Sequence, residues 1–290
     1  MLQLPDKPVS ESTRAQLQLL QEEVNQIPDF AAQVSKAQGL WRSKNSGNRA
    51  RIAAFEEVKR ILKSMSVAVE ICNYCEHNEA SDIEHIYPKS FFPSRTFRWE
   101  NYLLACKNCN TALKNDRFAI LNEADEVIYL KRGTQPANDR AAFINPRIEN
   151  PNEFIIYDAL SHNFVVIPEP DTADGKRAHV TLKILGLNAR DALKHARKTA
   201  YENFYNRLLV LVQQLEARDW ETLEPLLSPD ADRFDRNQPL QEIQQSLKTA
   251  LQKHFQKSPH PSVWYAIKLL GRHDAKWARL FNAIPEALNW

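Results

Sequence analysis

The sequence predicts a mostly α-helical protein with a small α+β core in its first half. Apolar residues recur at a spacing near 3.6 in long stretches at both ends of the chain, which is the period of an amphipathic helix. Between these stretches, short β-branched and aromatic runs alternate with turn residues, as expected for strands. The 290 residues, 43% of them hydrophobic and 26% charged, are enough for one elaborate domain or two.

The N-terminal segment, residues 1–70, is expected to be helical. Residues 12–27 and 48–65 have helical apolar spacing and lead toward the middle of the chain. Between them, residues 39–51 combine Trp41 with the cations Arg42, Lys44, Arg49 and Arg51. This stretch is interpreted either as a nucleic-acid contact with a stacking surface or as a loop that caps the next helix.

The cysteines give the strongest signal. The chain has four, and they form two Cys-x-x-Cys pairs, Cys72/Cys75 and Cys106/Cys109, with 30 residues between the pairs. Brought together, the pairs offer the four thiolates that zinc prefers. Two disulfides or a redox dithiol are the alternatives, but the N-terminus lacks the apolar core of a secretory signal, and cytosolic thiols stay reduced. We therefore expect a cytoplasmic protein with one structural Zn²⁺.

The segment between the cysteine pairs contains residues suited to hydrolysis. His85 can deprotonate water near neutral pH, and Glu84 can bind a hard divalent cation. Asn101 lies further along, and Asn110 follows the second pair, where a helix is expected to begin. A metal ion and a histidine base can together activate water for hydrolysis. The pattern therefore predicts metal-assisted hydrolysis.

Three further cations lie close to this segment in the sequence. They are Lys107, Lys114 and Arg117, and they are candidates for contacts with phosphates that flank the reacting one. A solvated helix face would show the same residues, so neither interpretation is excluded.

The stretch from Ile71 to Asp116 resembles the zinc-stapled form of the HNH nuclease family. The resemblance implies a ββα-metal motif, in which a short β-hairpin and a helix bind one divalent metal. It implies that His85 activates the attacking water, that Glu84 and Asn110 ligate the catalytic metal, and that Asn101 holds the hairpin loop. Many members carry Asp and His where this sequence has Glu and Asn, so both Mg²⁺ and Mn²⁺ remain candidates. The expected nuclease core is residues 71–125.

The rest of the chain is expected to form two further zones. Residues 126–176 contain a candidate strand at 127–130 and a candidate hairpin formed by 154–157 and 164–167. Residues 177–290 form a helical region, with helical spacing from residue 178, a long run at 189–217, and helices near 240–255 and 262–270. A basic cluster in this region is a candidate contact for DNA or a partner, or a solvated face; it comprises Arg190, Lys194, His195, Arg197 and Lys198.

The layout of the whole chain has a second resemblance. A helical lead-in, the Cys-Asn-Tyr-Cys-Glu motif, the Ile144-Asn145-Pro146 element, a hairpin and a Leu185-Gly186-Leu187-Asn188 helix start look like the HNH subunits of bacterial anti-phage defence operons of the Septu type, also found beside retrons. Those nucleases work with an ABC or SMC-like ATPase. The resemblance implies that the C-terminal helices dock such an ATPase in the bacterial cytoplasm.

Charge and hydropathy limit the remaining choices. A formal net charge of only +2 argues against a broadly basic protein that wraps nucleic acid, so DNA contacts must come from local clusters. No run is long and apolar enough to span a membrane. The sequence thus predicts a metal-dependent endonuclease acting on DNA. The alternatives are a zinc-stapled binding or scaffold protein without catalysis and a stand-alone nuclease of the restriction type.

Overall fold

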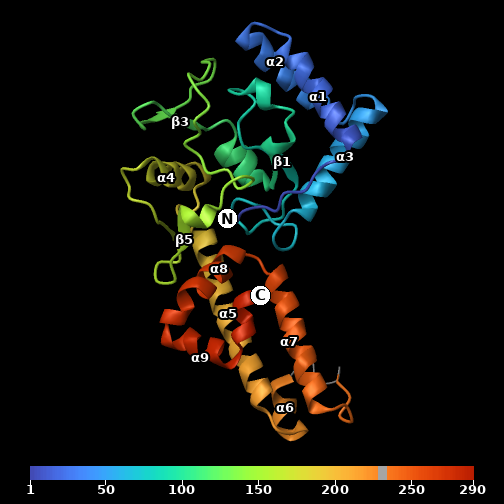
Figure 1. Cartoon of the computed structure of the whole chain (residues 1–290), viewed down its shortest axis with the longest axis vertical. Helices are drawn as coiled ribbons and strands as arrows, with labels where there is room; N and C mark the ends of the chain where they lie inside the picture. The colour runs from blue at the N-terminus through green and yellow to red at the C-terminus, as the bar shows by residue number, and fades with distance from the viewer. Residues whose placement is uncertain (228–233) are drawn as a thin grey trace.

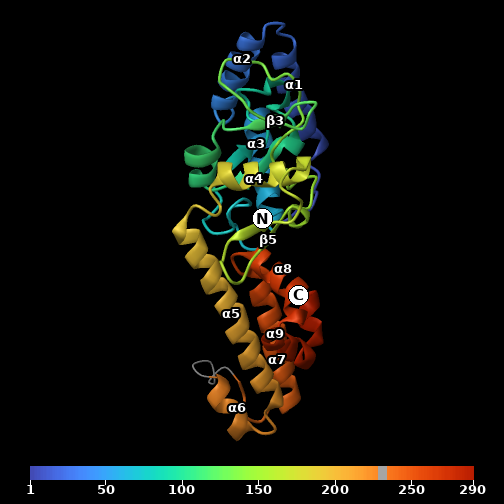
Figure 2. The ribbon, with the colours of Figure 1, turned by 90° about the vertical axis from the view of Figure 1, so that its left-hand side faces the viewer.

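The computed structural model describes residues 1–227 and 234–290, and it confirms a mostly helical protein with small antiparallel sheets. The molecule is elongated (Figure 1). One half holds the N-terminal helices and the short strands, and the other holds the helices from α5 onward. Figure 2, turned by a quarter, shows α5 running from the first half along the second. No helix in the described ranges is long and apolar enough to cross a bilayer.

Three helices form the N-terminal part: α1 (Glu11–Asn25), α2 (Phe30–Arg42) and α3 (Arg49–Ser64). Each begins after a polar residue, Ser10, Asp29 or Asn48, whose side chain accepts a hydrogen bond from a backbone N–H of the first turn. Helix α1 packs against α3. The prediction of helices near 12–27 and 48–65 is confirmed.

Helix α2 was not predicted, and residues 39–42 belong to it rather than to a loop. Its sequence gives little periodic signal, because Ala37 is its one fully buried residue. Helix α2 packs on α1 and on a short 3₁₀ turn, η1 (Pro93–Arg95).

A buried glutamine joins α1 to the loop that leads to the second strand. Gln21 donates from Nε2 to the carbonyl oxygen of Pro93 at 3.1 Å and accepts from the Phe97 N–H at 2.8 Å. Both backbone groups lie in a loop with no strand partner there, so the side chain satisfies them. The helix thereby fixes the position of residues 93–97.

The central hairpin consists of β1 (Asp82–His85) and β2 (Tyr102–Ala105), which are antiparallel with Glu84 opposite Leu103 and His85 opposite Tyr102. Strand β2 is buried along its whole length. It is followed by a short π-helical segment, η3 (Asn108–Lys114). Its wide turn is closed by a hydrogen bond from the Asn115 N–H to the Asn110 carbonyl at 2.6 Å. The expected helix is therefore present, but it begins at Asn108, inside the second cysteine pair, and not at Asn110.

Two more hairpins follow, β3 (Ala119–Leu121) with β4 (Val127–Tyr129), and β5 (Ile155–Tyr157) with β6 (Phe164–Val166). The predicted hairpin at 154–167 is confirmed. The expected boundary between residues 125 and 126 falls inside the β3–β4 hairpin, so it does not separate two structural units.

Helix α4 (Ala173–Leu185) starts five residues before the predicted position, because Thr172 caps it and its first turn contains no large apolar residue that would show a period. It ends at Gly186, whose φ of +56° is the left-handed conformation that glycine adopts without strain. Helix α4 packs against η3.

The second half contains α5 (Asp191–Glu216), α6 (Trp220–Leu227), α7 (Leu240–Lys257), α8 (Pro261–Leu270) and α9 (Ala275–Ala283). Helix α5 is its spine and contacts each of the others. A cluster of aromatic side chains forms the core, with Phe204 of α5 against Phe255 at 4.9 Å and Trp264 at 5.2 Å between ring centroids.

The basic cluster at the start of α5 is only partly available to a ligand. Arg197 is fully buried, donates to the carbonyl oxygens of His162 at 2.9 Å and Leu187 at 3.0 Å, and lies over the Phe164 ring. It joins the β5–β6 hairpin to α5. The expectation of a five-residue contact surface is therefore wrong for Arg197, whose donors are needed inside the fold.

Candidate functional site

The four cysteines come together as one cluster. Their Sγ atoms all lie within 4.8 Å of one another, and those of Cys75 and Cys106 are 3.9 Å apart. A tetrahedral Zn²⁺ with bonds of about 2.3 Å places its sulfurs about 3.8 Å apart, so the cluster has the size that zinc requires. All four side chains are buried and unpaired by disulfides. The predicted four-cysteine metal site is supported by this geometry.

Several N–H groups point at the sulfurs. Cys106 Sγ lies 3.4 Å from the Cys109 N–H donor and 3.6 Å from Asn78 Nδ2, and Cys109 Sγ lies 3.6 Å from Arg190 Nη2. Such donors offset the excess negative charge of four thiolates around a divalent ion. Arg190, which follows α4 in the chain, thus joins the cysteine cluster to the start of α5.

His85 ends β1 and is 4% exposed. Its Nε2 lies 3.1 Å from the carbonyl oxygen of Thr96, which also accepts from the Tyr102 hydroxyl at 2.7 Å. A carbonyl oxygen can only accept, so Nε2 carries the proton and Nδ1 keeps a free lone pair. This is the tautomer required of a base that takes a proton through Nδ1.

The surroundings of His85 keep it neutral. Burial lowers the pKa of His85 well below its ordinary value, and the nearby ammonium groups of Lys89, Lys114 and Lys44 lower it further. The Trp41 ring packs edge-on against the imidazole, with 4.2 Å between centroids. A neutral, fixed imidazole is able to accept a proton near pH 7.

Asn101 closes the loop between the two strands. Its Oδ1 accepts from the Tyr87 N–H at 2.7 Å, and its Nδ2 donates to the carbonyl oxygens of Tyr87 at 3.1 Å and Arg95 at 2.9 Å. One amide therefore holds both sides of the loop that contains Thr96, the hydrogen-bond partner of His85. This arrangement is the one that the resemblance implies for the asparagine.

Glu84 is buried against a lysine. Its Oε1 lies 2.5 Å from Nζ of Lys114, which is also fully buried and donates to the His85 carbonyl at 2.7 Å. Burial raises the pKa of Glu84, and the charge of Lys114 opposes that rise. Lys114 was expected to contact phosphate, but its ammonium is enclosed between Glu84 and His85, so it is not available to a substrate.

Asn110 projects from η3 toward β1. Its Nδ2 lies 3.2 Å from Oδ2 of Asp82. Because a carboxylate accepts and does not donate, the amide nitrogen faces Asp82 and the amide oxygen is turned away from it. Asp82 was not singled out from the sequence, although it precedes Glu84 by two residues and so lies on the same face of β1. That alternation was the available signal.

Two clefts meet at this point. The site cleft has a volume of about 390 Å³ and is lined by residues that include Glu84, His85, Lys89 and Asn110. The side cleft has a volume of about 570 Å³ and lies between α3 and β1; Trp41, Lys44, Lys59 and Asp82 line it. Asn110 lines both clefts, so they adjoin. Lys107 and Arg117 are exposed and line neither cleft.

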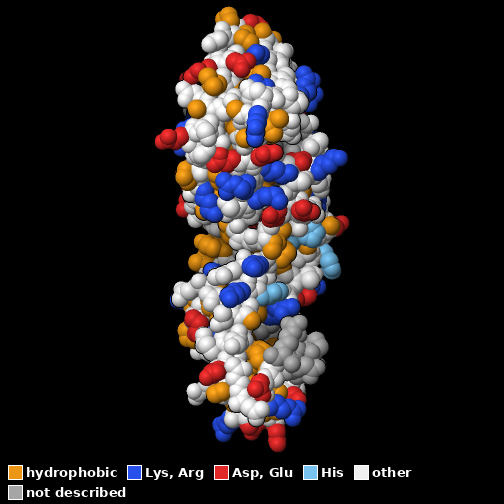
Figure 3. Space-filling view, turned by 90° about the vertical axis from the view of Figure 1, so that its right-hand side faces the viewer, with side chains coloured by type: hydrophobic (Ala, Val, Ile, Leu, Met, Phe, Trp, Pro, Cys, Tyr) orange, Lys and Arg blue, Asp and Glu red, His pale blue; other side chains and the backbone are white. Residues whose placement is uncertain are grey.

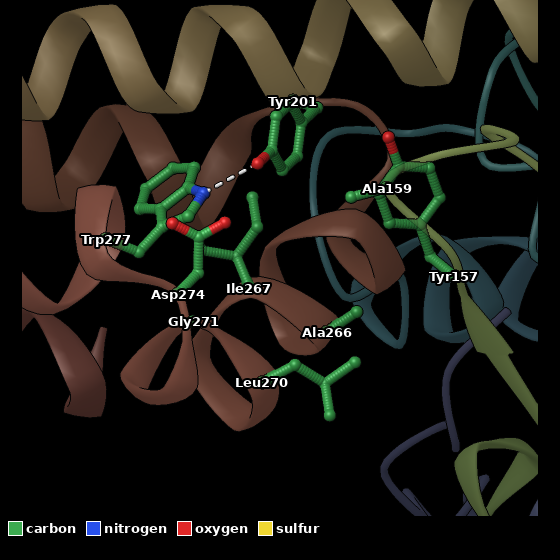
Figure 4. Close-up of a pocket in the computed structure, with 9 residues that line it drawn as sticks. All are labelled: Tyr157, Ala159, Tyr201, Ala266, Ile267, Leu270, Gly271, Asp274 and Trp277. Atoms are coloured by element: carbon green, nitrogen blue, oxygen red, sulfur yellow. Dashed lines mark hydrogen bonds between the residues drawn. The ribbon is translucent and has the colours of Figure 1, made fainter.

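A third pocket lies in the second half, between the β5–β6 hairpin and the helices, and it has a volume of only about 70 Å³ (Figure 4). Its side chains are mostly apolar, and the Trp277 indole donates to the Tyr201 hydroxyl at 2.8 Å. The carboxylate of Asp274 is used as the N-cap of α9. This pocket has neither the size nor the groups for hydrolysis of a nucleic acid.

Comparison with known proteins agrees with the geometry. Residues 72–116 match the family described as HNH endonuclease. No curated protein matches the chain, and no solved structure matches it either. The match covers both cysteine pairs, β1, β2 and η3, which bring His85, Glu84 and Asn110 to one cleft. The similarity to the HNH endonuclease family is therefore confined to residues 72–116, the segment that holds the cysteine cluster and the central hairpin.

Proposed function

We propose that the protein is a metal-dependent endonuclease that hydrolyses phosphodiester bonds in DNA, with His85 as the general base. The observation that carries the proposal is the state of His85, a buried neutral imidazole whose Nε2 is held by the Thr96 carbonyl and whose Nδ1 is free. His85 lines the site cleft together with Glu84 and Asn110, whose side-chain oxygens can ligate a metal ion.

Glu84 and Asn110 are the proposed ligands of the catalytic metal. Glu84 lines the site cleft, and because its Oε1 is paired with Lys114, its other carboxylate oxygen is the one proposed to bind the cation. Asp82 leaves the amide oxygen of Asn110 free. Two oxygen ligands suit Mg²⁺ or Mn²⁺, which complete their coordination with water and phosphate. Such an ion stabilises the charge that develops on the phosphate and the leaving oxygen.

The protein side chains supply the remaining parts of the reaction. Nδ1 of His85 takes the proton of the attacking water, while the Thr96 carbonyl stabilises the positive imidazolium through Nε2. Asn101 keeps the Thr96 loop in place. Lys114 holds the Glu84 carboxylate and the His85 backbone together, so the base and the ligand keep a fixed spacing.

Contacts with DNA are expected to be local. On the side shown in Figure 3, lysine and arginine side chains form a band at the height of α3, with carboxylates along both edges. Lys59, Arg60 and Lys63 are cations of this helix, and Lys59 lines the side cleft. The adjacent acidic groups explain the small net charge, and they confine attraction for phosphate to this band and to the clefts.

The proposed biological role is that of an effector nuclease in bacterial anti-phage defence, working with an ABC or SMC-like ATPase. The resemblance of the whole-chain layout supports this role, and the second half of the molecule, which contributes no group to the site cleft, is the proposed docking region. Leu269 and Leu270 at the end of α8 are about half exposed there.

The test of the nuclease is His85→Ala. The purified protein is incubated with supercoiled plasmid and Mg²⁺ or Mn²⁺, and nicking is followed on a gel. Removal of a general base is expected to slow cleavage by about 10²–10⁴-fold. His273→Ala, which removes an exposed histidine outside both clefts and outside the basic cluster of α5, serves as the matched control.

The zinc content and the circular dichroism of both variants are expected to equal those of the wild type, because neither residue contacts the cysteine cluster. Cleavage by His85→Ala at the wild-type rate would show that the base lies elsewhere. Wild-type protein that cleaves neither DNA nor RNA with either metal would favour a binding module without catalysis.

A further inference from the structure

Two lysines lie on the same tryptophan at the place where the clefts meet. Lys44, in the turn after α2, has its Nζ 4.8 Å from the centroid of the Trp41 ring, and Lys89, in the loop after β1, has its Nζ 5.9 Å from the same centroid. Lys44 lines the side cleft and Lys89 lines the site cleft. Asn110 is the wall that the clefts share.

Both ammonium groups are half-buried and lack a counter-ion. Neither lies within 4.0 Å of a carboxylate in the described ranges, whereas Lys36 of α2 pairs with Glu23 at 2.8 Å. Burial lowers the pKa of Lys44 and of Lys89. Asp82 attracts Lys44 from a distance, and Lys59 repels it. Glu84 attracts Lys89, and Lys114 repels it. Partly desolvated cations without a partner are costly, so this pair is arranged for an external anion.

We propose that Lys44 and Lys89 form a phosphate clamp that binds the backbone of the nucleic acid on the two sides of the reacting phosphate. The identity of the anion rests on the proposed nuclease function. The Trp41 ring supports both ammonium groups by cation–π contact and limits their motion. The same ring packs against His85, so the clamp and the base are held by one side chain.

The clamp explains why α2 belongs to the site. Its last turn carries Trp41, and Lys44 lies two residues beyond its end; both lie outside the segment that matches the HNH family. The position of the bound strand relative to His85 therefore depends on a helix that lies outside the matched segment. Lys89 lies within the matched segment, directly after Pro88.

The experiment measures binding without cleavage. All variants carry His85→Ala, and fluorescence anisotropy follows fluorescein-labelled 20-nucleotide DNA, single-stranded and duplex, in Ca²⁺ between 50 and 200 mM NaCl. Lys44→Ala and Lys89→Ala are each expected to weaken binding roughly tenfold. Each is expected to reduce the slope of log K against log salt by about 0.9 on duplex or about 0.7 on a single strand. Lys44→Arg and Lys89→Arg are expected to restore the slope.

The matched control is Lys36→Ala, which removes a lysine of α2 that lies in neither cleft. Affinities and slopes of both alanine variants equal to those of the control would overturn the clamp, as would the absence of DNA binding at 50 mM salt. Circular dichroism and zinc content identify a misfolded alanine variant. In that case the salt slope of the corresponding arginine variant tests the clamp. Because binding is measured in a background that cannot use His85, a lysine effect supports the clamp even if the wild type fails to cleave.

Discussion

The buried ion pair between Lys114 and Glu84 permits a sharp prediction about stability. Lys114→Met keeps much of the side-chain volume and removes the ammonium, which leaves the Glu84 carboxylate buried without a counter-charge. Loss of one partner of a buried pair costs about 3–5 kcal/mol. Glu84→Gln/Lys114→Met removes both charges, and we expect it to cost only about 1–3 kcal/mol, the cost of a buried His85 carbonyl without its donor.

The dependence on pH gives the same prediction a second readout. In Lys114→Met, the charge that most strongly opposes the effect of burial is gone, so the folded-state pKa of Glu84 rises further above the ordinary value of 4.5. A carboxyl with a raised folded-state pKa contributes stability that is fully present below the unfolded pKa and is lost as pH rises through the folded pKa. The single variant is therefore expected to recover stability relative to the double variant as pH falls from 7 toward 4.5. Both variants keep the cysteine cluster, so loss of zinc at low pH affects them equally.

The assay is urea unfolding followed by tryptophan fluorescence, with zinc content measured in each sample. The wild type, both single variants and the double variant form a thermodynamic cycle, in which a coupling of at least about 2 kcal/mol is expected. A Lys114→Met protein as stable as the wild type would refute the reasoning, as would a double variant whose loss equals the sum of the two singles. Either result would mean that the ion pair does not exist in solution.

The remaining predictions concern the cysteine cluster and the second half of the molecule. Purified protein is expected to contain about one zinc per chain, and Cys106→Ser is expected to lose the metal and several degrees of melting temperature; metal analysis and thermal unfolding check this, and unchanged stability would remove the structural metal. If an ATPase docks on the second half, affinity purification from the native operon is expected to recover it, and Leu269→Asp/Leu270→Asp is expected to reduce its yield without changing the zinc content. A monodisperse lone chain that cleaves DNA at full rate and retains no neighbouring protein would contradict the defence role.

The cysteine cluster and the local site were predictable because their information lies close together in the sequence. The Cys-x-x-Cys spacing, the Glu84-His85 pair and Asn110 lie within one matched segment, and short turns bring them together. The helices with strong apolar periods were predictable for the same reason, because apolar residues that recur about every 3.6 positions mark the buried face of a helix.

Other features depend on contacts between residues that are distant in the sequence, and no local sequence pattern predicts them. Nothing in the sequence around Lys114 indicates that its ammonium crosses the hairpin to Glu84. Arg197 looks like a surface cation, yet it becomes the link between the β5–β6 hairpin and α5. Helix α2 buries too little to show a period, although its Trp41 reaches His85. These positions are set by tertiary packing.

The cysteine cluster also lies at both ends of the loop that holds His85. A metal ion that joins the two cysteine pairs closes a loop of 30 residues, and His85, Thr96 and Asn101 all lie inside it. A cross-link that closes such a loop lowers the conformational entropy of the unfolded chain. By the chain-entropy relation, this stabilises the folded state by about 3–4 kcal/mol. Without the metal, the contacts of the hairpin must offset the whole entropy that the loop loses on folding. A metal ion bound by the four thiolates would therefore favour the folded arrangement of the loop that holds His85 and the Thr96 carbonyl.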